Sequence, residues 1–254
     1  MYILTYFYKK IMNKTVNIIC MKWGDKFPSF YVNRLYGMIF RNITLPFQLT
    51  CFTDNAKGIR EEVNIEPIPT IELPNGIPER GWKKLTVLES NLAGLSGQAL
   101  FLDLDVLIVS NIDSFFNHEG DFLIAHDKKR PKKVEGNSSV FRFNIGQHDD
   151  VLQFFKKNIN LVKQQFRHEQ AYLSKKIHDK NILGYWPDEW VPSFKYHCVP
   201  SLFMRFFKEP SIPLNAKIIL FHGLPNPPDA IEGISGKWYR YIKPTPWIKD
   251  YWKE

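Results

Sequence analysis

The sequence predicts a single α/β domain in which helices flank a mostly parallel central sheet. The chain has 254 residues, of which 44% are hydrophobic, enough for one large core. Apolar runs with strand character alternate with segments of helical spacing over roughly the first hundred residues. Polar side chains follow these apolar runs, as they do where parallel sheets bind ligands at the carboxyl ends of their strands.

The first predicted elements are a strand, a helix and two further strands. Residues 15–21 (TVNIICM) form an apolar run that predicts a buried strand, and residues 22–30 form a polar loop. Residues 30–43 have the composition of a helix. Residues 47–55 predict a second strand with a polar end, and residues 63–69 a short third strand. This order is typical of parallel strands joined by crossovers.

The next predicted elements end in two aspartates. Residues 71–81 are a loop rich in Pro and Gly, and residues 82–94 have helical leucine spacing. Residues 99–109 (ALFLDLDVLIV) predict the strand that carries Asp103 and Asp105. The loop after the first strand, the polar end of the second and this aspartate pair are therefore expected at one edge of the sheet.

The pattern changes from about residue 135. Residues 149–166 and 168–177 have helical character, and residues 216–223 (AKIILFHG) predict a strand. The last third is rich in Pro, Trp and Tyr, but no linker separates it from the rest. The sequence thus predicts one domain over residues 1–254.

Net charge and cysteine spacing indicate which partners and which compartment to expect. The net charge of +8 and the pI of about 9.2 favour anionic partners: nucleotides, phosphorylated glycans, acidic lipids or nucleic acid. The basic tract at residues 126–136 comes with no nucleic-acid motif, so no nucleic acid is expected. Three cysteines without metal-type or disulfide-type spacing indicate a reducing compartment, the cytoplasm. Lys9 and Lys10 interrupt the first apolar stretch, so neither a signal peptide nor a spanning helix is expected.

Asp103 and Asp105 are two like charges at the end of an apolar run, where they repel each other and cost desolvation energy. Carboxylates two residues apart on a strand point the same way, and at a strand end both can ligate one cation. Mg²⁺ and Mn²⁺ accept few protein carboxylates and complete their shells with substrate phosphates. The pair therefore indicates a Mg²⁺ or Mn²⁺ site; the alternative is a solvated acidic strand end.

Residues 81–116 (GWKKLTVLESNLAGLSGQALFLDLDVLIVSNIDSFF) resemble the metal-binding segment of GT-A glycosyltransferases. The resemblance is closest to glycosyltransferase family 8, the group of glycogenin and the bacterial lipopolysaccharide galactosyl- and glucosyltransferases. Weaker resemblances follow in order along the chain, at residues 16–27, 135–144, 167–174 and 216–230.

The resemblance implies a GT-A (Rossmann-like) fold and transfer of a hexose from a nucleotide sugar, a UDP-sugar, to a glycan or glycolipid acceptor. It implies a bacterial enzyme of lipopolysaccharide or surface polysaccharide synthesis that retains anomeric configuration and acts in the cytoplasm. Residues 15–135 would form the nucleotide- and metal-binding half, and residues 136–235 the acceptor and sugar half. Residues 236–254 would be a basic, aromatic tail in peripheral contact with the inner face of the membrane; the alternative is a tail that packs on the sheet.

The same resemblance assigns the metal ligands to Asp103, Asp105 and His222. Asp103 would also face the ribose. A histidine after an apolar run is alternatively a structural residue. The family's lysine beside the diphosphate has no counterpart, because residues 226–227 are Asn-Pro; Lys237, further along the chain, would be the candidate to supply this cation instead.

The donor contacts also follow from the resemblance. Trp23 would stack on uracil or, alternatively, cap the sheet edge. A basic residue, Lys83 or Lys84, would lie over the diphosphate, and the other would be solvated. The complete set of expected donor contacts is Met21, Lys22, Trp23, Asp25, Lys84, Asp103, Asn137 and Ser138.

Three residues are candidates for catalysis. Glu169 and Gln170 correspond to a segment near the anomeric carbon, or else are an ordinary helix start. Asp188 lies between Trp186 and Trp190, a composition that suits sugar binding, or else is part of a plain loop.

Two other functions remain open. A haloacid-dehalogenase-type phosphatase also places Asp-x-Asp after a hydrophobic strand and would use Asp103 as its nucleophile. A carbohydrate-binding protein without turnover would keep the same fold.

Overall fold

The computed structural model describes residues 15–73, 81–127, 134–236 and 240–254. The segment with Lys9 and Lys10, most of the basic tract at 126–136, and Lys237 lie outside the described residues.

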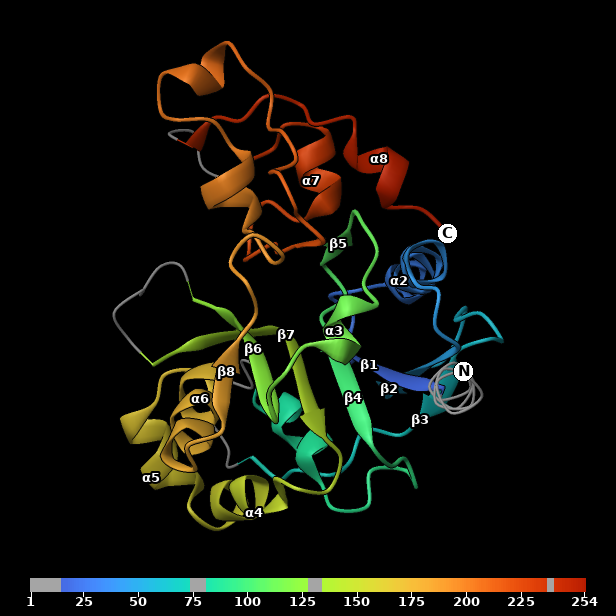
Figure 1. Ribbon diagram of the computed structural model, residues 1–254, viewed down its shortest axis with the longest axis vertical. Helices are drawn as coiled ribbons and strands as arrows, with labels where there is room; N and C mark the ends of the chain where they lie inside the picture. Colours follow the sequence, from blue (N-terminus) through green and yellow to red (C-terminus); the bar gives the residue numbers. More distant parts are fainter. Residues whose placement is uncertain (1–14, 74–80, 128–133, 237–239) are drawn as a thin grey trace, which may run out of the picture.

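A seven-stranded sheet is the centre of the structure (Figure 1). Every neighbouring pair is parallel except the two that involve β7, which runs antiparallel to β4 and β6. The prediction of a mostly parallel sheet is confirmed. The carboxyl ends of six strands and the amino end of β7 therefore share one edge. In spatial order the strands are β3 (Asn64–Glu66), β2 (Phe47–Thr53), β1 (Val16–Lys22), β4 (Gln98–Leu102), β7 (Gly136–Asn144), β6 (Phe122–His126) and β8 (Leu183–Tyr185).

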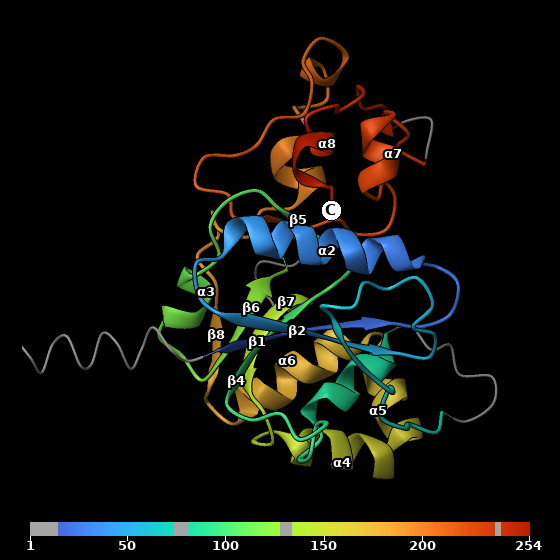
Figure 2. The ribbon, with the colours of Figure 1, turned by 90° about the vertical axis from the view of Figure 1, so that its right-hand side faces the viewer.

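The sheet is covered on both faces, as Figure 2 shows. Helix α2 (Ser29–Asn42) packs on one face together with Ile18 and Cys20 of β1. The neighbouring residues Ile19 and Met21 belong to the core on the other face. A strand buried on both faces has a continuous apolar sequence, which is why β1 is predictable. The opposite face is covered by the 3₁₀ helix η1 (Trp82–Leu88) and helices α4 (Asp149–Lys157), α5 (Ile159–Gln165) and α6 (Glu169–Asp179).

The predicted strand over residues 99–109 is wrong in its second half. Strand β4 ends at Leu102, and the backbone turns, with the Val106 N–H 3.5 Å from the Asp103 carbonyl. The next two apolar residues, Leu107–Ile108 (β5), pair with Ile218–Ile219 (β9) in a separate two-stranded sheet. The aspartates therefore lie in a turn beyond the strand, where both carboxylates can reach a cleft.

Other boundaries also differ from the prediction. The helix expected over 82–94 ends at Leu88, the helix over 149–166 is interrupted at Asn158, and the strand over 216–223 is two residues long. Strands β6 and β8 were not predicted. The remaining short elements are α3 (Ser114–Asn117), a helical turn η2 (Phe194–Cys198), η3 (Met204–Phe206), α7 (Pro227–Ile231) and α8 (Ile248–Tyr251).

Residues 187–254, here called the C-terminal lobe, occupy the upper end of the molecule in Figures 1 and 2. The end of this lobe packs on α2. The Trp252 ring lies 5.1 Å from the Tyr31 ring and under the Arg34 guanidinium, and Ile248 is buried. The Arg41 guanidinium donates to three carbonyls of residues 251–254. In its described part, the tail expected at a membrane surface is thus packed against the domain.

Candidate active site

A cleft of about 360 Å³ opens at the carboxyl edge of the sheet. Strand β1, the turn after β4, the start of η1 and the start of α6 supply its walls. The residues that line it are Met21, Trp23, Lys26, Phe27, Gly81, Lys84, Asp103, Leu104, Asp105 and Glu169. The six predicted site residues among them are Met21, Trp23, Lys84, Asp103, Asp105 and Glu169.

Lys84 and the two aspartates form the charged centre of the cleft. The Lys84 ammonium lies 2.7 Å from the Asp103 carboxylate, and both side chains are largely buried. Burial lowers the pKa of Lys84, but the charges of Asp103 and Glu169 outweigh this effect and raise it. Of the two lysines that the sequence left open, Lys84 is therefore the one that lines the cleft, and it is cationic.

Asp105 is nearly buried, with 8% of its surface exposed. Burial, together with the charge of Asp103, raises the pKa of Asp105 to about 7; Lys84 and Lys26 act in the opposite direction. Asp105 is thus about half protonated near neutral pH, next to the Asp103 carboxylate that pairs with Lys84. The energetic cost expected from two adjacent like charges is present in the structure.

The aspartate pair fits a hard divalent cation, because such a cation would lower the pKa of Asp105 and offset its burial. Within the described residues no group of three His, Cys, Asp or Glu side chains is placed to hold a metal. The donor set present is two carboxylates, which suits Mg²⁺ or Mn²⁺ that takes its other ligands from phosphate and water.

His222 lies outside the cleft lining and is engaged by two neighbours. The Asn137 amide oxygen accepts from the Ser139 N–H at 2.9 Å, which directs the amide nitrogen to His222 Nδ1 at 3.1 Å. Nδ1 is therefore an acceptor, and Nε2–H donates to the Ser193 hydroxyl at 2.8 Å. Because both ring nitrogens are engaged in this arrangement, a ligand role requires His222 to leave one of these partners.

Glu169 begins α6 and is buried where it faces the cleft. The Ser138 hydroxyl donates to its carboxylate at 2.7 Å. Gly81 has a φ of +84°, and a side chain there would place its Cβ 3.1 Å from a Glu169 oxygen. Only glycine combines this backbone with so close an approach, so Gly81 positions the end of the loop against the carboxylate.

Four further predicted site residues are not part of the cleft lining. The Lys22 ammonium donates to the Asn55 carbonyl at 3.3 Å, away from the cleft. Asp25 is exposed. The Gln170 amide donates to Glu135 at 3.3 Å, and the Asp188 side chain, 61% exposed, lies 3.7 Å from the His126 ring.

Four cleft residues were missed by the sequence analysis: Lys26, Phe27, Gly81 and Leu104. Lys26 had a usable signal, because it is a basic residue in the loop after the first strand. The Lys26 ammonium lies 4.4 Å from the centre of the Phe27 ring. Gly81 and Leu104 contribute through backbone geometry, which composition does not reveal.

The fold is similar to that of solved glycosyltransferases. An active-site mutant of LgtC matches with a TM-score of 0.58 and 12% identity, over 89% of this chain and 92% of that protein. The galactosyltransferase LgtC in complex with donor and acceptor sugar analogues gives a TM-score of 0.55 over the same shares. The apo form of the glycosyltransferase GlyE of Streptococcus pneumoniae TIGR4 gives 0.55 at 14% identity, over 84% of this chain and 56% of GlyE.

No protein-family model matches the sequence, and no curated protein matches it. At 12–14% identity the structural likeness shows the fold alone. The predicted GT-A fold is confirmed, and all of these structural neighbours are glycosyltransferases.

Proposed function

We propose that this protein is a metal-dependent glycosyltransferase that moves a hexose from a nucleotide sugar, a UDP-sugar, to a glycan acceptor. The observation that carries the proposal is the cluster of Lys84, Asp103 and Asp105 in the cleft at the carboxyl edge of the sheet. Fold similarity to glycosyltransferases supports the same class.

The described residues suggest a division of labour. Trp23 presents an aromatic ring that can stack on uracil beside Met21. Lys84 and Lys26 supply positive charge where a diphosphate leaves, and that charge stabilises the transition state. A divalent cation on Asp103 and Asp105 would add Lewis-acid stabilisation of the departing nucleotide.

Of the carboxylates in the cleft, Glu169 is the one proposed to face the reacting carbon of the sugar. It is oriented by Ser138 and Gly81, a fixed geometry that suits a group that must face one carbon atom. Gln170 bonds Glu135 and is proposed to position α6. Asp188 lies outside the cleft lining and would contact the acceptor.

The proposed setting is bacterial lipopolysaccharide or surface polysaccharide synthesis in the cytoplasm, with retention of anomeric configuration. These parts rest on the sequence resemblance. Within the part of the chain that the structure describes, no helix combines the length and apolar content needed to cross a bilayer.

The test is thermal unfolding with UDP, GDP, CMP or ADP, each with Mn²⁺, Mg²⁺ or EDTA. A ligand that binds only the native state raises the melting temperature. We expect one nucleotide to stabilise the wild type only when metal is present, and Asp105→Ala to abolish the shift. Asp121→Asn, which changes an exposed carboxylate just before β6 and outside the cleft lining, is the control and should keep the shift.

Three outcomes would reject the proposal. If no combination of nucleotide and metal raises the melting temperature, the cleft does not bind a nucleotide-sugar donor. Phosphate release from a general phosphatase substrate, lost in Asp103→Asn but unaffected by nucleotides, would favour the phosphatase instead. Binding of glycans without any nucleotide response would favour a carbohydrate-binding protein.

A further inference from the structure

The segment of residues 201–208 (SLFMRFFK) exposes an unusual amount of apolar surface. Five of its apolar residues are 40% or more exposed, and two of them, Phe203 and Phe207, are 79% and 74% exposed. Exposed aromatic side chains in such density are uncommon on a monomeric soluble surface and mark an interaction site. The other three are Leu202, Met204 and Phe206, at 58%, 40% and 54%.

This segment lies at an extreme of the molecule. Figures 1 and 2 both show it as the orange loop at the upper end of the long axis, beyond α7 and far from the sheet. The position allows the loop to enter another phase while the rest of the domain stays in water. If these exposed side chains were core residues that had lost their packing partners, we would expect to find them beside the sheet.

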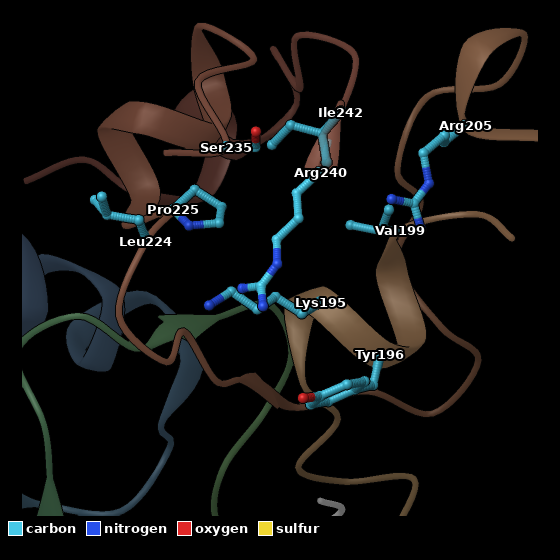
Figure 3. A pocket seen from close by; sticks show the side chains of 9 residues that line it. All are labelled: Lys195, Tyr196, Val199, Arg205, Leu224, Pro225, Ser235, Arg240 and Ile242. Atoms are coloured by element: carbon cyan, nitrogen blue, oxygen red, sulfur yellow. The ribbon is translucent and has the colours of Figure 1, made fainter. Parts of the chain in front are cut away.

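A basic pocket of about 280 Å³ adjoins the loop. Three cationic side chains, Lys195, Arg205 and Arg240, line it, and none of the described lining residues is acidic. Figure 3 shows Arg240 and Lys195 approaching from opposite walls, with Arg205 on a third side. The Arg205 Nε is buried and has no hydrogen-bond partner among the described residues. Buried donors without partners indicate a missing acceptor.

The pocket and the loop are one structural unit. Arg205 belongs to both, because it lies in the middle of the exposed segment and lines the pocket. The Phe206 ring stacks on Tyr241 at 5.2 Å, next to Arg240 in the chain. Lys243 donates to the Phe207 carbonyl at 3.1 Å. An apolar tip and a ring of cations are thus held in one fixed arrangement.

We propose that residues 201–208 insert into the interfacial layer of an anionic lipid bilayer and that the basic pocket binds a lipid phosphate there. Aromatic side chains flanked by Lys and Arg are the combination that binds such interfaces. The cations discriminate against a second copy of this chain, whose surface also carries net positive charge. Glu209 is the single acidic residue of the segment 200–210. This docking does not depend on the proposed transfer reaction.

The experiment is flotation of the full chain with phosphatidylcholine vesicles that contain or lack phosphatidylglycerol, without nucleotide. We expect binding to the anionic vesicles, reduced roughly tenfold or more in the Phe203→Ser/Phe207→Ser variant, because each buried Phe contributes strongly to partitioning. Phe40→Ser is the matched control: Phe40 is 67% exposed on α2 and should leave binding unchanged. Unchanged melting temperatures show that both variants fold.

A second pair of variants tests the pocket. Arg205→Gln/Arg240→Gln should lower binding to anionic vesicles by about fivefold per cation removed and leave binding to neutral vesicles as it was. Lys57→Gln, an exposed lysine on the sheet half, is the control.

Three results would overturn the proposal. Wild-type protein that does not float with anionic vesicles rejects it. Stabilisation by inorganic phosphate without vesicle binding assigns the pocket to a soluble anion. Self-association that disappears in the double Phe variant, again without vesicle binding, assigns the loop to a contact between copies. Because nucleotide is absent, none of these results bears on the donor cleft.

Discussion

The sheet edge and the C-terminal lobe handle polar and apolar groups in opposite ways. At the sheet edge, charged side chains are buried and have partners within the protein: Lys84 pairs with Asp103, and Ser138 donates a hydrogen bond to Glu169. In the lobe, cations line an open pocket and phenylalanines such as Phe203 face solvent. These arrangements fit the two proposals made above: a small ligand that enters the first region, and a lipid surface that the second region approaches. The predictions below test this contrast, from the largest expected effect to the smallest.

Asp105→Asn should separate activity from stability. The amide has the same shape but cannot be charged, so we expect transfer or donor hydrolysis to fall roughly 10³-fold. The melting temperature of the metal-free protein should stay the same or rise at pH 8, because the repulsion with Asp103 and the burial of a charge are removed. Assays with the nucleotide sugar found by thermal shift and a melting curve test both parts. A fall in stability that parallels the loss of activity would show that Asp105 supports the fold instead.

Binding of Mn²⁺ with nucleotide should depend on pH with a midpoint near 7. Asp105 must lose its proton to ligate the metal, and its pKa is raised to about 7. Affinity should thus fall about tenfold per pH unit below 7 and level off above it. Lys84→Met removes a charge that lowers this pKa, so the midpoint should move upward. Calorimetric titration measures it, and a Lys83→Met variant whose midpoint moves as far would contradict the assignment.

His148 should make the sheet half sensitive to acid. It is 2% exposed, its ring contacts Phe122, and burial together with the charge of Lys180 lowers its pKa to about 4. The unfolded chain then binds more protons between pH 6.5 and 4, so this contribution is complete above pH 6.5 and is lost as the pH falls toward 4. The loss is up to about 3 kcal/mol.

The measurement is chemical unfolding of wild type and His148→Leu between pH 4 and 7.5. The variant should lose less stability on acidification, since leucine has no group that can take up a proton. His178→Leu, an exposed histidine on α6, should follow the wild type. Parallel pH curves for wild type and His148→Leu would be inconsistent with a buried neutral ring.

Arg41→Met tests the joint between the two regions. It removes hydrogen bonds of 2.7–2.8 Å to three carbonyls of residues 251–254, and we expect a loss of about 1–2 kcal/mol. Arg34→Met, which removes cation–π contacts with Trp252 at 4.0 Å and Phe30 at 4.9 Å, should cost about 0.5–1 kcal/mol. Urea unfolding compares them. Deletion of residues 236–254 would remove Trp252 and Ile248 from the core, so it tests folding before it tests membrane contact.

The sheet half was the more predictable region, and the reasons are local. The centre of β1, residues 18–21, is apolar because both of its faces are buried, and Asp103 and Asp105 are only two positions apart in the sequence and line the same cleft. The two-residue strand β5 was mistaken for the end of β4 because the apolar run continues through the turn. The pattern of apolar residues indicates which positions are buried, but it does not show that the chain passes from one sheet to another.

Contacts between distant segments were beyond sequence reasoning. Asn137 and His222 are 85 positions apart, and no pattern near either residue predicts their hydrogen bond. Cys20 and Cys51 look unrelated in the sequence, yet they are register partners on neighbouring strands, both as free, buried thiols. In the lobe, Phe203 and Phe207 have the composition of a core, and only the tertiary structure shows that they face outward.

The packing of the tail on α2 has a consequence for biosynthesis. Arg41 leaves the ribosome early, but the carbonyl of Glu254 that it binds is made 213 residues later. Contacts of such long sequence separation must overcome loop-closure entropy and form late. A nascent chain that already contains every strand of the central sheet therefore still carries an uncovered ring at Tyr31, awaiting Trp252. During that interval we expect the growing chain to be exposed to chaperones and to aggregation, until the segment with Trp252 is synthesised and docks.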